Sequence, residues 1–164
     1  METLPAEGLL ASSWLLIALP LAGAAVLLLG GRRTDRFGHL LGTATVVAAF
    51  VLAVVYTIGL AGLDERSVDV DLFTFISAAD LDVRAGLLYD ALSAIFVLLI
   101  TGVGSLIHIY SIGYMAHDDG RRRFFAYLNL FVAAMLLLVL GNSFVALYVG
   151  WEGVGLASYL LIAF

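Results

Sequence analysis

Long apolar runs alternate with short polar segments along the chain, and this pattern predicts helices that cross a membrane. The first run, Leu9 to Gly30, has about 22 residues without a charge, which is enough to cross a hydrocarbon core ~30 Å thick. Four more runs cover 38–62, 87–115, 124–140 and the residues from 143 onward. The sequence therefore predicts an all-α, polytopic transmembrane helix bundle with about five spans.

The segment between the second and third runs is acidic and alternates in part. Apolar and polar positions alternate over 68–76 and 81–85, and the residues between them, 77–80, are turn-like. Acidic side chains outnumber the two arginines here, which keeps the segment out of a bilayer: Asp64, Glu65, Asp69, Asp71, Asp80 and Asp82 stand against Arg66 and Arg84. We expect a small β-hairpin, at about 66–86, that covers one membrane face.

Arginine clusters indicate how the spans are oriented. Three arginines follow the first span at 31–36, and Arg121–Arg123 follow the third span. Because positively charged loops stay on the cytoplasmic side, the N-terminus and the hairpin are expected outside. We interpret Arg121–Arg123 first as a topology signal and second as a contact for anionic lipid or a neighbouring subunit.

The composition agrees with a membrane protein. Of the 164 residues, 63% are hydrophobic and 13% are charged, and the mean hydropathy is +1.08. All eight cations are arginines in short loops, so there is no basic face for nucleic acid. The chain has no Cys and only three scattered His, which gives no metal-ligand spacing. Any redox chemistry is expected in another chain.

Glu152 is the one acidic residue deep inside an apolar run. It follows Ser143 by about nine residues, which places it on the order of 13 Å into the membrane, near the midplane. A charge at that depth costs at least ~2.5–3.5 kcal/mol, and such residues usually line a protein or water-filled interior and serve transport. Glu152 is therefore a candidate proton or ion site.

Tyr148, Gly155 and Tyr159 share a helical face with Glu152. The hydroxyls of Tyr148 and Tyr159, together with the lack of a side chain at Gly155, would leave room for water beside the carboxylate. Burial would favour the neutral acid and a nearby cation the carboxylate, so the group could take up and release a proton. The alternative is a permanently neutral or ion-paired Glu152 that only holds helices together.

Other polar residues in the spans have ordinary explanations as well. Asp90 is expected to cap the third helix, and His108 to lie near the cytoplasmic boundary of the core, as an interfacial residue rather than a member of a proton path. We expect Asn129 and Thr101 to form hydrogen bonds between helices. A packing seam on the fifth helix is expected from Gly150, Gly153 and Ala157.

The two ends of the chain differ from those of a secreted protein. The first residues, METLPAE, are acidic where a secretory signal would be basic, so the first helix is expected to stay in the mature protein. The last residue, Phe164, lies inside an apolar run. We expect either a longer gene product or a fragment.

Three segments resemble a known family: HIYSIGYM at 108–115, RFFAYLNLF at 123–131 and LYVGWEGVGLASYLLI at 147–162. They are similar to the largest antiporter-like membrane subunit of respiratory complex I, which is subunit L in bacteria and subunit 5 in mitochondria. Ala157 stands where many members have Cys. The resemblance covers most of the chain, including the hairpin that leads into Tyr89 and Asp90.

The resemblance implies a proton-translocating membrane subunit of an NADH:quinone oxidoreductase in the bacterial cytoplasmic membrane. NADH, FMN, the iron–sulfur clusters and quinone would be bound by partner subunits, and a neighbouring antiporter-like subunit would contact this one, as would lipid. Glu152 aligns with the family's fifth-helix glutamate, which is thought to pair with a lysine on a later helix. This chain contains no Lys.

The resemblance also implies a division of the chain. Residues 1–115 would hold three leading helices and the outside hairpin, and 116–164 would begin the first antiporter-like helix repeat, truncated in its fifth span. Two alternatives share these helices: a subunit of a multisubunit cation/proton antiporter and a purely structural membrane subunit. Glu152 is the expected proton-transfer residue, and Tyr148, Tyr159 and His108 are candidates for the proton path, with His108 the weaker one.

Overall fold

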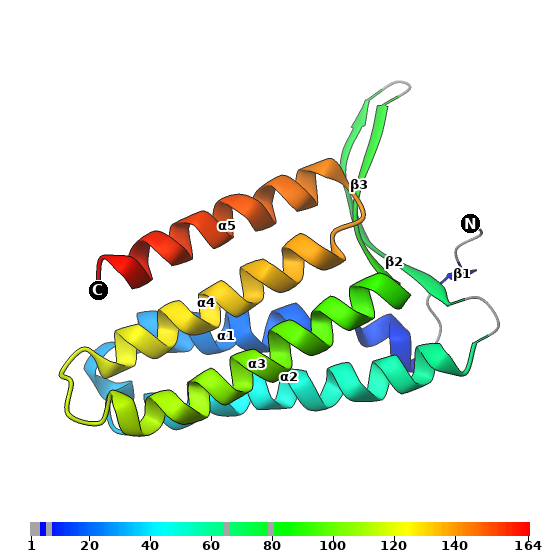
Figure 1. Cartoon of the computed structure of the whole chain (residues 1–164). Coiled ribbons are helices and arrows are strands. Elements are labelled where there is room, and N and C mark those ends of the chain that lie inside the picture. Colours follow the sequence, from blue (N-terminus) through cyan, green and yellow to red (C-terminus); the bar gives the residue numbers. More distant parts are fainter. Residues whose placement is uncertain (1–3, 6–7, 64–65, 79–80) are drawn as a thin grey trace.

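The computed structural model describes residues 4–5, 8–63, 66–78 and 81–164. Its long helices lie side by side in a bundle, with a small sheet at one end (Figure 1). Among the described residues, five helical segments are long and apolar enough to cross a membrane, as predicted. The helices are η1 (Gly8–Ser12), α1 (Leu15–Leu29), η2 (Gly31–Thr34), α2 (Gly38–Ala61), α3 (Ala91–Tyr114), α4 (Arg121–Leu140) and α5 (Phe144–Ile162).

The sheet confirms the predicted hairpin and extends it. β2 (Ser67–Ala78) pairs antiparallel with β3 (Leu81–Asp90), and β1 (Leu4–Pro5) adds a short parallel strand on the other side of β2. No pattern in the sequence indicated β1. Of the predicted turn at 77–80, residues 79–80 lie outside the described residues.

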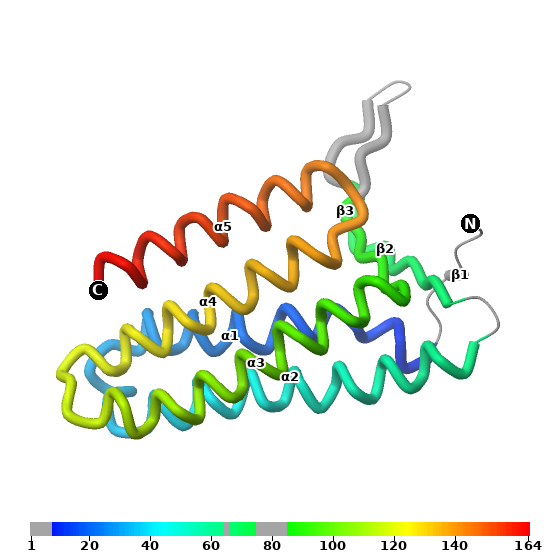
Figure 2. Tube along the Cα trace, viewed as in Figure 1, coloured from blue at the N-terminus to red at the C-terminus, as the bar shows by residue number. Residues whose placement is uncertain are grey.

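Three helix boundaries differ from the prediction. The first span begins with the short η1, and α1 starts only at Leu15. The third helix was expected from Leu87, but β3 continues through Asp90 and α3 begins at Ala91, without a loop (Figure 2). Leu87 is buried there as a strand residue, and Asp90 caps α3 as expected, its Oδ1 accepting a bond of 2.7 Å from the Ser93 amide. The fourth helix starts at Arg121 rather than Phe124.

Buried apolar side chains join the sheet to the bundle. Val68, Leu87 and Tyr89 from the strands belong to the same core as Tyr56 of α2 and Leu140 of α4. Burial raises the pKa of the Tyr89 phenol, although its contact with the Thr57 hydroxyl, at 3.1 Å, acts in the opposite direction. The sheet is thus part of the folded core and not an appendage.

Asn142 ties the turn between α4 and α5 to the base of the hairpin. Its backbone N–H donates to the Gly86 carbonyl at 3.1 Å, and its side-chain Oδ1 accepts from the Gly86 backbone N–H at 3.0 Å. Its Nδ2 donates to Asp69 Oδ1 at 2.9 Å. These bonds fix where α5 begins.

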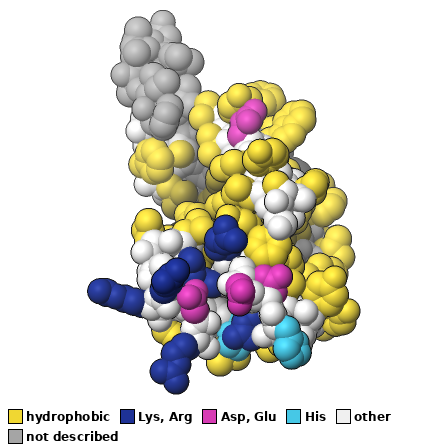
Figure 3. All heavy atoms as spheres, turned by 90° about the vertical axis from the view of Figure 1, so that its left-hand side faces the viewer, with side chains coloured by type: hydrophobic (Ala, Val, Ile, Leu, Met, Phe, Trp, Pro, Cys, Tyr) yellow, Lys and Arg dark blue, Asp and Glu magenta, His cyan; other side chains and the backbone are white. Residues whose placement is uncertain are grey.

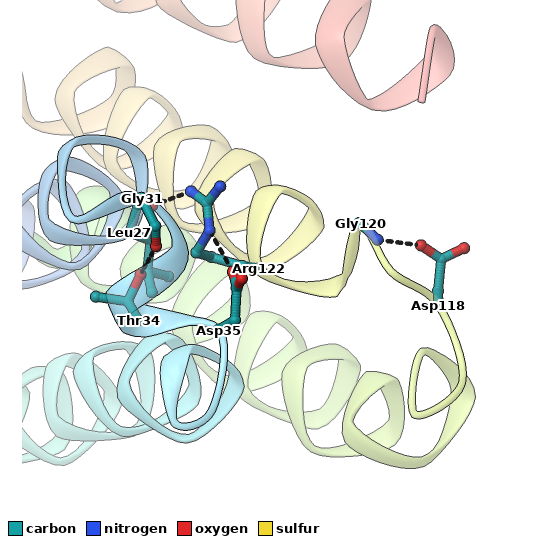
Figure 4. A network of polar contacts seen from close by, with 7 residues as sticks. All are labelled: Leu27, Gly31, Thr34, Asp35, Asp118, Gly120 and Arg122. Atoms are coloured by element: carbon teal, nitrogen blue, oxygen red, sulfur yellow. Dashed lines mark hydrogen bonds and ion pairs between the residues drawn. The ribbon is translucent and has the colours of Figure 1, made fainter.

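Charged side chains gather at the end of the bundle opposite the sheet (Figure 3). There Arg122 of α4 reaches the loop between α1 and α2, where its Nε lies 2.7 Å from Asp35 Oδ1 and its guanidinium also donates to the Leu27 carbonyl (Figure 4). These bonds at the first turn of α4 explain why the helix includes the arginines that the sequence assigned to a loop.

Candidate functional site

One face of α5 packs against α4 through small residues. A Cβ at Gly150 would lie 2.6 Å from the Leu138 amide nitrogen, and one at Gly153 would lie 3.0 Å from the Ala134 Cβ. Ala157, one turn further along, is fully buried. The predicted seam is therefore confirmed, and it turns the opposite face of α5 away from the bundle.

Glu152 lies near the middle of α5 and is exposed. Tyr148 and Tyr159, which were predicted to share its face, are 61% and 69% exposed, and a Cβ at Gly155 would meet nothing within 4 Å. Only 11% of the most apolar 18-residue stretch of α5 is buried inside the structure, against 28–44% of the corresponding stretches in the other four spans. The described chain therefore covers α5 on one side and leaves the Glu152 face open.

Within the described part of the chain, Glu152 makes no hydrogen bond or ion pair. Its surroundings on α5 are apolar or aromatic, including the exposed Trp151 and Leu156. A carboxylate in such a band needs a polar or cationic partner when the face is covered. The described residues do not supply such a partner.

His108 lies elsewhere, inside the bundle. Its side chain is only 1% exposed, whereas the sequence suggested an interfacial residue. The ring Nδ1 lies 2.7 Å from the Gly104 carbonyl oxygen and Nε2 lies 3.2 Å from Asn129 Nδ2. The expected position near the boundary of the core concerns depth along α3, whereas burial depends on which face the neighbouring helices cover, so the expectation of depth stays a prediction.

Asn129 and Thr101, the two residues expected to bond between helices, behave differently from each other. Asn129 is fully buried and bonds to α2 and α3, as predicted for a contact between helices. Thr101 instead donates to the Val97 carbonyl at 2.6 Å in its own helix. A threonine hydroxyl can donate its hydrogen bond to a carbonyl of its own helix. The sequence pattern cannot distinguish this bond from one between helices.

The described residues contain no group of three or more His, Cys, Asp or Glu side chains that could hold a metal ion.

A family model described as the N-terminus of NADH-ubiquinone oxidoreductase (complex I) chain 5 matches residues 75–125. Over 154 residues, 93% of the chain, 63% of positions are identical to "NADH-quinone oxidoreductase subunit L" of Mycobacterium tuberculosis. The chain is homologous to subunit L. Identity to the subunit L of Escherichia coli is 39% over 92% of the chain, and to "NADH-ubiquinone oxidoreductase chain 5" of Mycosarcoma maydis 40% over 91%.

The chain spans about a quarter of the length of these relatives: 24%, 25% and 22%, respectively. The comparisons confirm the resemblance to subunit L and subunit 5 that the three sequence segments indicated. Neither the comparisons nor the fold tests the roles expected for Glu152, Tyr148, Tyr159 and His108, which stay predictions. The buried contact between His108 and Asn129 was missed, because only the packing of α3 on α4 brings the two side chains together.

Proposed function

We propose that this chain is part of a membrane subunit that moves protons in an NADH:quinone oxidoreductase, with Glu152 as a proton-transfer site. The observation that carries the proposal is a carboxylate halfway along an apolar helix, on a face that the described chain does not cover. The homology to subunit L supports the assignment to this enzyme. Tyr148 and Tyr159 flank Glu152 and would line its proton path.

In this proposal a positive charge outside the described residues controls Glu152. A cation held close to the side chain stabilises the carboxylate, and its withdrawal favours the neutral acid. A cycle of approach and withdrawal therefore takes up a proton and releases it again, provided that the two states open to different sides. The exposed phenol groups of Tyr148 and Tyr159 can hydrogen-bond to water beside the carboxylate.

The layout follows the same proposal. The chain lies in a bacterial cytoplasmic membrane, with the sheet outside and the arginine-rich end inside. Residues 1–115 are the leading helices with their hairpin, and 116–164 begin an antiporter-like repeat. Other membrane subunits, in particular a neighbouring antiporter-like one, and lipid contact it, while NADH, FMN, iron–sulfur clusters and quinone are bound by partner chains.

A cysteine-labelling experiment tests this orientation, since the chain has no native Cys. Single cysteines replace exposed Thr74, in the hairpin, and exposed Asp119, between α3 and α4. In intact cells a maleimide that cannot cross membranes should label the first position and spare the second until the cells are opened. The opposite labelling pattern would invert the proposed topology.

Purification of the complete protein with its partners separates complex I from a cation/proton antiporter. With an affinity tag on the subunit, we expect subunits that oxidise NADH and the electron paramagnetic resonance signals of iron–sulfur clusters in the purified assembly. A set made only of membrane subunits, with no NADH oxidation, would refute the assignment to complex I. It would support the antiporter, which would use the same helices and the same Glu152.

A further inference from the structure

A buried polar cluster joins three helices at a distance from the open face of α5. It consists of Thr45 of α2, His108 of α3 and Asn129 of α4. The Thr45 hydroxyl lies 2.7 Å from Asn129 Oδ1, and His108 Nε2 lies 3.2 Å from Asn129 Nδ2. Neither His108 nor Asn129 is more than 1% exposed. The Glu152 site does not use any of these side chains.

Two glycines make room for the cluster. A Cβ at Gly23 of α1 would lie 2.7 Å from both Asn129 Oδ1 and the Thr45 hydroxyl oxygen. A Cβ at Gly42 of α2 would lie 2.8 Å from Asn129 Nδ2. Since real Cβ atoms do not approach so closely, the amide of Asn129 fits only because both positions lack a side chain. Four helices therefore meet around this one amide.

The hydrogen-bond partners fix which atoms carry protons. Asn129 Nδ2 lies 3.0 Å from the Phe125 carbonyl oxygen, which can only accept, so the amide must present its NH2 group on this side. The same NH2 group faces His108 Nε2, which must then offer a lone pair. The ring proton is left on Nδ1, where it donates to the Gly104 carbonyl at 2.7 Å. Every polar atom of the ring and the amide has a partner in this neutral form.

The surroundings give a charged imidazole no compensation. The Phe125 and His108 rings lie edge to face with centroids 5.9 Å apart, and the groove of about 390 Å³ that His108 helps to line is otherwise lined by apolar residues of α3, α4 and α5. Of the described titratable groups on packed elements, His39 of α2 also lies edge to face with the Phe125 ring, with centroids 6.3 Å apart, while Arg122 of α4 is paired with Asp35. A buried charge without a counter-charge is strongly unfavourable.

We propose that His108 and Asn129 are positioning residues: a permanently neutral imidazole, held as its Nδ1–H tautomer by Asn129, joins α3 to α4 and, through Thr45, to α2. Because α5 packs on α4, these hydrogen bonds hold in place α4, the helix against which the Glu152-bearing α5 packs. His108 is then not a proton carrier, in contrast to the weaker role that the sequence suggested for it.

The nitrogen signals of His108 test the proposal directly. The complete protein, labelled with ¹⁵N-histidine and reconstituted in lipid bilayers, is measured by solid-state NMR, and the His108 signals are assigned by their loss in His108→Gln. We expect one protonated nitrogen, Nδ1, and one bare nitrogen, Nε2, at every pH between about 5 and 8. A doubly protonated ring within this range, or a proton on Nε2, would overturn the proposal.

Two variants test the part assigned to Asn129. Asn129→Asp places a carboxylate beside Nε2 and should convert His108 to the doubly protonated form. Thr101→Val removes a buried hydroxyl that bonds only within α3, and it should leave the spectrum unchanged. An unchanged spectrum in Asn129→Asp would show that Asn129 does not set the tautomer. If that variant does not fold, the wild-type spectrum still decides whether the ring is neutral. No readout here involves proton pumping, so the outcome is independent of the proposed role of Glu152.

Discussion

Replacing Glu152 with Gln is expected to lower proton pumping and coupled turnover of the intact enzyme by about tenfold or more. Gln has nearly the same shape and keeps a polar group at this position, but it cannot take up and release a proton. A positioned acid or base typically contributes about 10²–10⁴-fold to a proton-transfer step. The measurement is the rate of proton uptake by vesicles that contain the purified enzyme, normalised to NADH oxidation.

Two further variants give this experiment its controls. Asp119→Asn removes the same charge from an exposed position between α3 and α4 and should leave pumping unchanged. Glu152→Asp keeps a titratable group and should retain part of the activity. Equal amounts of purified assembly would show that Glu152→Gln affects function and not folding. If pumping per NADH and the turnover rate both stay at wild-type values, Glu152 has at most a structural role.

Replacing Gly150 with Ala is expected to destabilise the packing of α5 on α4 by about 1–3 kcal/mol, the usual cost of an overpacked contact. The added Cβ would lie 2.6 Å from the amide nitrogen and 2.7 Å from the Cα of Leu138. Both are backbone atoms, so the strain cannot be relieved by rotating a side chain, and α5 must move away from α4. Thermal unfolding of the purified protein in detergent measures the loss.

Gly59→Ala is the matched control for this variant. Gly59 also lies in an apolar helix, but a Cβ at this position would meet nothing within 4 Å. Its unfolding temperature should equal the wild-type value or lie slightly above it, because Ala favours helices more than Gly does. Equal unfolding temperatures for Gly150→Ala and Gly59→Ala would contradict a close seam between α4 and α5.

The sequence could predict what depends on local pattern and on length. The apolar runs predicted the five long helices, the alternation at 68–76 predicted the hairpin, and the spacing of Gly150, Gly153 and Ala157 predicted the seam. Asp90 was identified as a cap because its bond to Ser93 lies within one helical turn. In each case the deciding interaction joins residues that are close in sequence or that repeat at the period of a helix or strand.

The features that escaped prediction depend on which elements become neighbours. β1 is only two residues long and exists through its pairing with β2, more than 60 positions away in the sequence. Leu87 and Tyr89 are as apolar as helix residues, but pairing with β2 keeps them in a strand. The burial of His108 depends on Asn129, and no periodicity links a position on α3 to one on α4.

The hydrogen bonds of Asn142 bear on how freely α5 can move relative to the other helices. They fasten the start of α5 to the hairpin, Gly150 and Gly153 fit against α4 along its length, and Phe164 rests on Phe124 just after its last turn, with ring centres 5.6 Å apart. Tilting or sliding this helix would break all three attachments together. The helix is therefore held in place along its length, and under the proposed function a change of protonation would move the Glu152 side chain rather than α5.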